Sequence, residues 1–209
     1  MKLRLICIFL TISFISNAQI SRKLKDKVEI IDKKFFDIIL QTYDNKSYEE
    51  LYTLYSEISK TATNDELFYL ALNGNTFIRH NAAFSLLYKK DKRIIDLYKY
   101  YSKFPMQYEI KMSCIIAQQD MALSIRGYIL AELRNYEEYK IISKKSNQSK
   151  DFYTTEEINY YEKLDINFFK DCIDEFEIID ETYIPERLEI YKIINENWKD
   201  GKLQFPNNY

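Results

Sequence analysis

The sequence predicts a mainly α-helical fold, and three observations support this prediction. Apolar residues recur at three- and four-residue intervals along most of the chain, which is the spacing of an amphipathic helix. The 209 residues include only three glycines and three prolines, whereas tight turns and β-rich folds require many glycines. Serine or threonine precedes glutamate by three residues at several expected helix starts, as in a capping box. With 46% apolar and 16% aromatic residues, the chain has enough material for a packed core.

Residues 1–18 have the three parts of a secretory signal peptide. Lys2 and Arg4 supply positive charge before an apolar run over residues 5–15, and small side chains at 16–18 precede the expected cleavage site. The apolar run spans only about 16 Å as a helix, too little for a hydrocarbon core of about 30 Å. We therefore expect export to the periplasm or the exterior of a bacterial cell. The mature chain, 19–209, is expected to be a single mainly helical domain and not an integral membrane protein.

Helical hairpins are expected over residues 23–102. The first helix covers 23–43, and capping boxes at Ser47-x-x-Glu50 and Thr63-x-x-Glu66 open the next two. Gly74 is expected to act as a helix C-cap by taking the left-handed conformation. Two more helices are expected over 76–89 and 91–102, and Pro105 ends the series.

A short β-hairpin is expected near residues 107–126, because the pattern there changes to a period of two. Gln118-Gln119-Asp120 is the candidate turn, and 121–128 fits either a partner strand or the start of a helix. The alternating apolar positions are Tyr108, Ile110, Met112, Cys114 and Ile116.

Helices return over residues 154–200 after a polar, lysine-rich loop at 143–150. A third capping box, Thr154-x-x-Glu157, opens this series, and a helix over 167–179 follows. Pro185 suits the first turn of the last helix, which Gly201 closes.

The residues from the end of the third expected helix into the fourth have a recognisable order. A short turn, Asn73-Gly74-Asn75, is followed by Ile78, Arg79, Ala82, Ala83 and Leu86. This order resembles the second helix of a HEAT-type repeat, and the resemblance covers about residues 65–101. It implies α-solenoid-like hairpins that bind a partner, with Arg79 tying neighbouring repeats through an ion pair. Ala82 and Ala83 would let two helices approach closely, while Ile78 and Leu86 fill the space between them.

No catalytic, cofactor-binding or metal-binding residues are predicted. His80 is the only histidine, so histidine-based triads and zinc sites lack their usual partners, and a structural role is expected for it. Cys114 and Cys172 form a disulfide only if the fold brings them together. The charges, 30 basic and 32 acidic, lack the basic excess of a nucleic-acid binder. The acidic run near the C-terminus is expected to be a solvated helix face and comprises Asp171, Asp174, Glu175, Glu177, Asp180 and Glu181.

These observations predict a non-enzymatic module that binds a protein or peptide in the bacterial envelope. Tyr98 and Tyr101 are candidates for the partner surface, because tyrosine combines an apolar ring with a polar hydroxyl. The alternative for these residues is that tyrosine replaces phenylalanine at half-buried sites. Two other functions stay open: a carboxylate-dependent hydrolase of envelope polymers, since acidic residues are numerous, and an immunity-type inhibitor.

Overall fold

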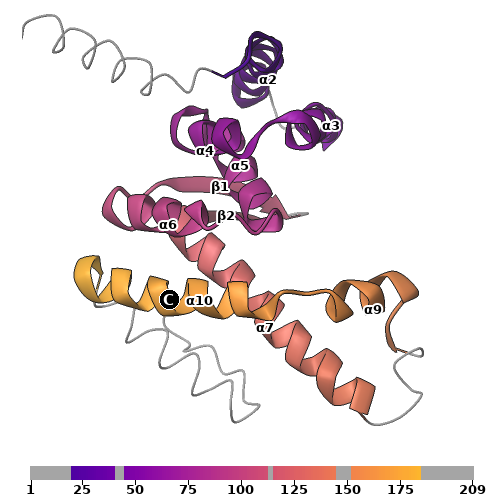
Figure 1. Cartoon of the computed structure of the whole chain (residues 1–209). Helices are drawn as coiled ribbons and strands as arrows, with labels where there is room; N and C mark the ends of the chain where they lie inside the picture. Colours follow the sequence, from indigo (N-terminus) through magenta and orange to yellow (C-terminus); the bar gives the residue numbers. More distant parts are fainter. Residues whose placement is uncertain (1–19, 41–44, 113–114, 145–151, 185–209) are drawn as a thin grey trace, which may run out of the picture. The chain divides into compact units, whose positions relative to one another are not determined.

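The computed structural model describes residues 20–40, 45–112, 115–144 and 152–184 (Figure 1). In these ranges the protein is mainly α-helical, with eight helices and one two-stranded antiparallel sheet. The chain divides into two compact units, residues 1–93 and 94–209, and each is described by itself. The expected signal peptide and the expected helix from Pro185 lie outside the described residues. The single domain expected over 19–209 stays a prediction.

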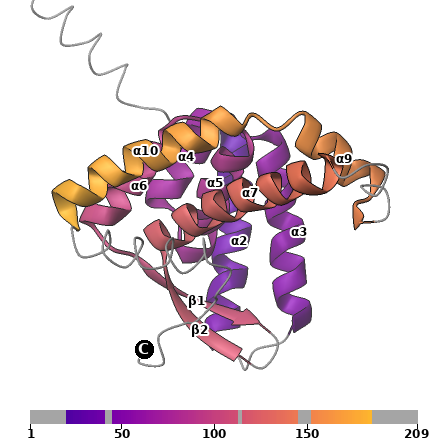
Figure 2. The same ribbon diagram turned by 90° about the horizontal axis from the view of Figure 1, so that it is seen from below.

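The first unit consists of two helical pairs. Helix α2 (Arg22–Leu40) packs against α3 (Asn45–Thr61), and α4 (Asn64–Asn73) packs against α5 (Thr76–Tyr88). Figure 2 shows α2 and α3 running side by side, and α3 also contacts α5. Because α3 begins at Asn45, Ser47 lies inside the helix and not at its cap, which corrects the first expected capping box. The core between these helices includes Leu24, Ile31, Leu51, Ile58, Leu67, Leu70, Ile78 and Leu86.

Both ends of α4 follow from local side-chain chemistry. The Thr63 hydroxyl accepts from the Glu66 amide while the Glu66 carboxylate accepts from the Thr63 amide, which confirms this capping box. Gly74 ends the helix and donates its amide to the Leu70 carbonyl, but its φ of −71° is not left-handed. The glycine is needed because a Cβ there would lie 2.5 Å from Cγ2 of Ile78. Close approach of α5 therefore explains Gly74, and the expected left-handed conformation was wrong.

Helix α5 supplies the centre of the first unit. Ala82 and Ala83 are fully buried, so their small side chains bring neighbouring helices close, as the repeat-like pattern implied. The Phe77 ring contacts the rings of Tyr52 and Tyr55 edge-on, at centroid distances of 5.2 and 6.2 Å. The α4–α5 hairpin is thus a tightly packed helical pair, while the solenoid character stays a prediction.

The second unit begins with α6 (Arg93–Lys103) and a β-hairpin. Strands β1 (Gln107–Met112) and β2 (Ile115–Asp120) are antiparallel, in a register that pairs Gln107 with Asp120. A hairpin near residues 107–126 was predicted, but the expected turn at 118–120 lies inside β2. The alternating pattern gives the faces of a strand but not the point where the chain reverses. Of the two alternatives left open for 121–128, the structure has the helix start.

Two long helices complete this unit. Helix α7 (Met121–Lys144) follows β2 directly and packs against α10 (Ile166–Tyr183), and the two cross in Figure 1. The short helix α9 (Thr155–Glu162) lies between them in sequence, and its Thr154–Glu157 capping box has both expected hydrogen bonds. The core of the unit includes Leu97, Ile125, Ile129, Phe169, Cys172 and Phe176.

Candidate functional site

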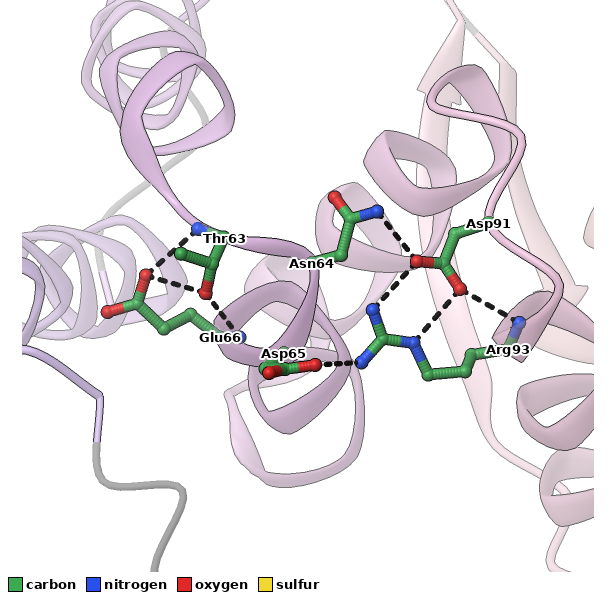
Figure 3. A network of polar contacts seen from close by, with 6 residues as sticks. All are labelled: Thr63, Asn64, Asp65, Glu66, Asp91 and Arg93. Carbon is green, nitrogen blue, oxygen red and sulfur yellow. Dashed lines mark hydrogen bonds and ion pairs between the residues drawn. The ribbon is translucent and has the colours of Figure 1, made fainter.

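A network of charged groups closes the loop between α5 and α6 onto the start of α4 (Figure 3). Asp91 accepts hydrogen bonds from Nε and Nη2 of Arg93, at 2.9 and 2.7 Å, and from Nδ2 of Asn64 at 2.6 Å. The Arg93 guanidinium also pairs with Asp65 and lies 5.6 Å from the centre of the Phe68 ring. The two elements joined by these contacts are 25 or more residues apart in sequence, so the network fixes tertiary structure.

The backbone before Asp91 explains why the carboxylate reaches these partners. Helix α5 ends in a Schellman motif, in which the Asp91 amide donates to the Leu86 carbonyl and the Lys90 amide to the Leu87 carbonyl. This motif requires a left-handed residue, and Lys90 has a φ of 53°. Hydrogen bonds from the Arg93 side chain lower the pKa of Asp91 to about 2, so the carboxylate is ionised at neutral pH. These residues form a structural clamp, in which the side chains of Asn64 and Arg93 donate hydrogen bonds to the Asp91 carboxylate.

The second unit contains a charged pair buried in its core. Asp180 of α10 and Arg126 of α7 are both about 1% exposed or less, and Nη1 of Arg126 lies 3.0 Å from Oδ2 of Asp180. The buried hydroxyl of Tyr98 donates to the same carboxylate, 2.9 and 2.8 Å from its two oxygens. The Tyr98 ring stacks on Phe176 with centroids 3.7 Å apart. These contacts tie α6, α7 and α10 together.

This core corrects two predictions. Asp180 belongs to the acidic run that was expected to be solvated, yet it is fully buried, while the other five members of the run are exposed. Tyr98 and Tyr101 were candidates for a partner surface, and both are also fully buried. They follow Ile94 and Leu97 on one face of α6, at the i, i+3, i+4, i+7 spacing of a buried stripe. The burial of Tyr98 and Tyr101 agrees better with the alternative, in which tyrosine takes the place of phenylalanine inside the protein.

Arg79 has a contact inside its own hairpin. Its Nε donates to the Gly74 carbonyl at 2.7 Å, and the neighbouring Asn75 caps α5 by accepting from the Ile78 amide. Asn75 also donates to Asp32 of α2 at 2.7 Å. The polar groups of the α4–α5 turn thus link α2, α4 and α5 through hydrogen bonds. The ion pair that the repeat resemblance implies for Arg79 stays a prediction.

His80 has the environment of a structural residue. Its ring lies 4.5 Å from the Phe84 ring on the next turn of α5. Burial lowers the pKa of His80 to about 4, so the imidazole is neutral at physiological pH. A neutral ring beside a phenylalanine contributes packing to the hairpin.

Four tyrosines gather where side chains of α9 and of the residues just before it contact side chains of α7. We call Tyr139, Tyr153, Tyr160 and Tyr161 the tyrosine surface. The Tyr161 ring lies 5.1 Å from the Tyr139 ring and 5.2 Å from the Tyr160 ring, centre to centre. Tyr153 contacts both Tyr139 and Tyr161 edge-on. Tyr139 is nearly buried, whereas Tyr160 is 44% exposed. The cluster therefore runs from the core of the unit to its surface.

Acidic side chains surround this cluster. The Tyr160 hydroxyl donates to Oε2 of Glu132 at 2.8 Å. Burial raises the pKa of Tyr153 and Tyr161, and the negative charges of Glu138 and Glu157 raise both further. The hydroxyls thus stay protonated in a region of negative potential. Tyr160 and Tyr161 are adjacent in the sequence, but the contacts of Tyr161 with Tyr139 and Tyr153 depend on the packing of α9 against α7.

The described residues give no indication of a metal centre or a membrane span. In these ranges, no group of three or more His, Cys, Asp or Glu side chains is placed to hold a metal ion. No described helix combines the length and the apolar character that crossing a bilayer requires. Cys172 is buried in α10, while Cys114 lies outside the described residues, so the expectation about their disulfide stays open.

Fold and geometry together define a mainly α-helical protein with a buried charged core and a half-exposed tyrosine surface. Compared with protein-family models, with curated proteins and with solved structures, the chain matches none of them.

Proposed function

We propose that the mature chain is an exported, non-catalytic helical module that binds a protein or peptide partner in the bacterial envelope. The observation that carries this proposal is the tyrosine surface, where rings in mutual contact reach solvent at Tyr160. Large rings with few rotatable bonds provide contact area at low entropic cost, which is why tyrosine is enriched where proteins bind one another. The leader-like residues 1–18 support the exported location.

The contacts of the buried Asp180 carboxylate favour a binding function over a hydrolytic one. Carboxylate-dependent hydrolases of polymers place two acidic groups on either side of the bond to be cleaved. Among the described residues, Asp180 is the fully buried carboxylate, and its oxygens accept from Arg126 and Tyr98 inside the core. A carboxylate with these partners is stabilised as a charge and is enclosed by α6, α7 and α10. It is suited to holding helices together.

The α4–α5 hairpin supports the scaffolding part of the proposal. The order of residues from Asn73 to Leu86 is what resembles a HEAT-type repeat. The burial of Ala82 and Ala83 and the lack of room for a Cβ at Gly74 show that this pair packs closely. Such hairpins present helix faces to partners. We propose that α4 and α5 act as one rigid element of the scaffold that contacts the partner.

Affinity capture tests the proposal. Tagged mature chain is incubated with an envelope extract, cross-linked and washed, and the recovered proteins are identified by mass spectrometry. We expect one partner to be recovered reproducibly and to bind the purified chain in a saturable, stoichiometric manner. Repeated recovery of no saturable partner, from cells grown under several conditions, contradicts the proposal.

A further inference from the structure

The charge around the tyrosine surface indicates the chemistry of its partner. Residues 152–184 contain ten acidic and two basic side chains, a net charge of −8, while the whole chain carries −2. Of these ten acids, nine are exposed, the exception being Asp180. The segment that supplies Tyr153, Tyr160 and Tyr161 is therefore strongly negative in a chain of nearly balanced charge.

The charge close to the tyrosine rings is also negative. The glutamates that act electrostatically on Tyr139, Tyr153 and Tyr161 come from both helices: Glu132 and Glu138 from α7, Glu157 and Glu162 from α9. The basic side chains of these elements are Arg126, Arg134, Lys140 and Lys144 on α7 and Lys163 after α9. Arg126 is buried with Asp180, and Lys140 is engaged with Glu137 at 3.9 Å. The charged groups that raise the pKa of Tyr139, Tyr153 and Tyr161 are carboxylates.

Helix α7 itself shows how a cation sits on an aromatic ring in this region. The ammonium group of Lys140 lies 5.5 Å from the centre of the Tyr136 ring. Such contacts are attractive because the face of an aromatic ring is negative, and guanidinium groups make them more often than ammonium groups. Tyr160, which is 44% exposed and hydrogen-bonded to Glu132, combines both attractions for a cationic side chain.

We propose that the tyrosine surface docks an arginine- or lysine-rich segment of a partner protein. The cationic side chains lie over the exposed part of Tyr160 and pair with Glu138 and Glu162. This inference rests on the proposed binding function and specifies its site and the chemistry of its partner. Arginine is favoured over lysine, because its planar guanidinium both stacks on rings and pairs with carboxylates through two hydrogen bonds.

The test measures binding of a fluorescent octa-arginine peptide to the mature chain by anisotropy, with octa-lysine and a neutral Gly-Ser peptide as probes for comparison. Glu138 and Glu162 are exposed, and neither belongs to a capping box. We expect Glu138→Lys with Glu162→Lys to weaken octa-arginine binding about tenfold or more at about 0.15 M salt. The matched control, Asp26→Lys with Glu49→Lys, changes net charge equally at exposed sites of the first unit. It is expected to weaken binding less than about threefold.

A second pair of variants tests the rings. Tyr160→Leu removes the aromatic face at a 44% exposed position, and Tyr160→Phe keeps the face while removing the hydroxyl that binds Glu132. We expect Tyr160→Leu to weaken octa-arginine binding about two- to five-fold and Tyr160→Phe to leave it within about twofold. Circular dichroism of each variant checks that the fold is intact.

Several results overturn the inference. Equal weakening by the two charge-reversal pairs shows general attraction without a local site, and equal loss in Tyr160→Leu and Tyr160→Phe removes the role of the ring. Self-association of the chain that Tyr160→Leu abolishes assigns the surface to a second copy. If an envelope partner is captured equally well by the Glu138→Lys, Glu162→Lys variant, the inference fails while the proposed function stands. If neither the envelope extract nor the peptide gives saturable binding, both fail.

Discussion

The two charged clusters of this protein contain the same kind of pair, an aspartate with an arginine, in different surroundings. In the first unit, the side chains of Asp91 and Arg93 keep 12% and 29% of their surface exposed. In the second, Asp180 and Arg126 keep 0% and 1%. Removing one partner from a solvated pair leaves a charge that water can hydrate, whereas removing one from a buried pair leaves a charge in a medium of low dielectric constant. We therefore expect burial, more than the number of hydrogen bonds, to set the energetic importance of each cluster.

The largest effect is expected at Asp180. Asp180→Ala removes the buried counter-charge of the Arg126 guanidinium, which also pairs with the half-exposed Glu177 at 3.7 Å, and we expect it to reduce the free energy of unfolding by about 3–5 kcal/mol. Urea unfolding followed by circular dichroism measures the change. Asp174→Ala, at an exposed position of the same helix, is the control and should change stability by less than about 0.5 kcal/mol.

An apolar replacement of the whole cluster separates burial from hydrogen bonding. The triple variant Tyr98→Phe, Arg126→Met, Asp180→Leu removes both buried charges and the hydroxyl together, while Glu177, the exposed partner of Arg126, stays in contact with water. Since neither buried charge of the pair is left, it should recover much of the stability lost in Asp180→Ala. A triple variant as unstable as the single one would show that the specific contacts, and not the orphaned charge, explain the loss.

The two glycines that the structure describes extend the comparison to the backbone. A Cβ at Gly74 would lie 2.5 Å and 2.8 Å from Cγ2 and Cβ of Ile78, whereas a Cβ at Gly127 in α7 would meet nothing within 4 Å. Gly74→Ala is expected to reduce stability by about 1–3 kcal/mol through overpacking. Gly127→Ala is expected to increase it by about 0.5–1 kcal/mol, because alanine is the better helix former. Melting temperatures that shift in the same direction contradict this reading.

A smaller and pH-dependent effect is expected at Asp91. Its pKa is about 2 in the folded protein and 3.8 ordinarily, so its contribution to stability is complete above pH 3.8 and is lost as the pH falls towards 2. Asp91→Ala should cost about 1–2 kcal/mol at pH 7, after allowance for solvent screening. The difference between wild type and variant should shrink below pH 3.8. A difference that is constant between pH 7 and pH 2.5 counts against the clamp.

The smallest effect is expected at Lys90, the residue before this clamp. Its φ of 53° is unfavourable for a side chain with a Cβ, so Lys90→Gly should raise stability by about 0.5–1 kcal/mol. Lys92→Gly, two residues later in the same loop, offers no such gain and serves as the control. Loss of stability in Lys90→Gly would mean that the lysine side chain contributes more than the backbone conformation costs.

Local patterns in the sequence were sufficient to predict most helices and the β-hairpin. They were not sufficient to predict the buried charged pair or the tyrosine surface. The capping boxes at Thr63 and Thr154 depend on residues three apart, so they can be recognised without knowledge of tertiary structure. The hairpin was recognisable from its alternation, while its turn was misplaced because alternation is the same on both strands. Asp180 was assigned to the solvated face with its acidic neighbours. It lies four residues after Phe176 and eight after Cys172, on the apolar stripe of α10, and that position was the signal of a buried charge.

The pairing of Asp180 with Arg126 and the contacts among the four tyrosines could not be predicted from the sequence, because they depend on how α7 packs against α9 and α10. Each involves residues from helices that are separated in sequence, and no local pattern gives their distances. The error at Tyr98 and Tyr101 has the same origin. Adjacent tyrosines indicate a surface only if they share a face, and Tyr100 is exposed while Tyr98 and Tyr101 are buried.

We propose that the acidic groups of this protein stabilise its core and face its partners without cleaving any substrate. The most direct test incubates purified mature chain, and its Asp180→Asn variant, with peptidoglycan and with a mixture of unfolded proteins, and quantifies released fragments by mass spectrometry. The expected result is no release above the buffer control by either protein. Release by the wild type that disappears on changing Asp180, with the variant still folded by circular dichroism, contradicts the account.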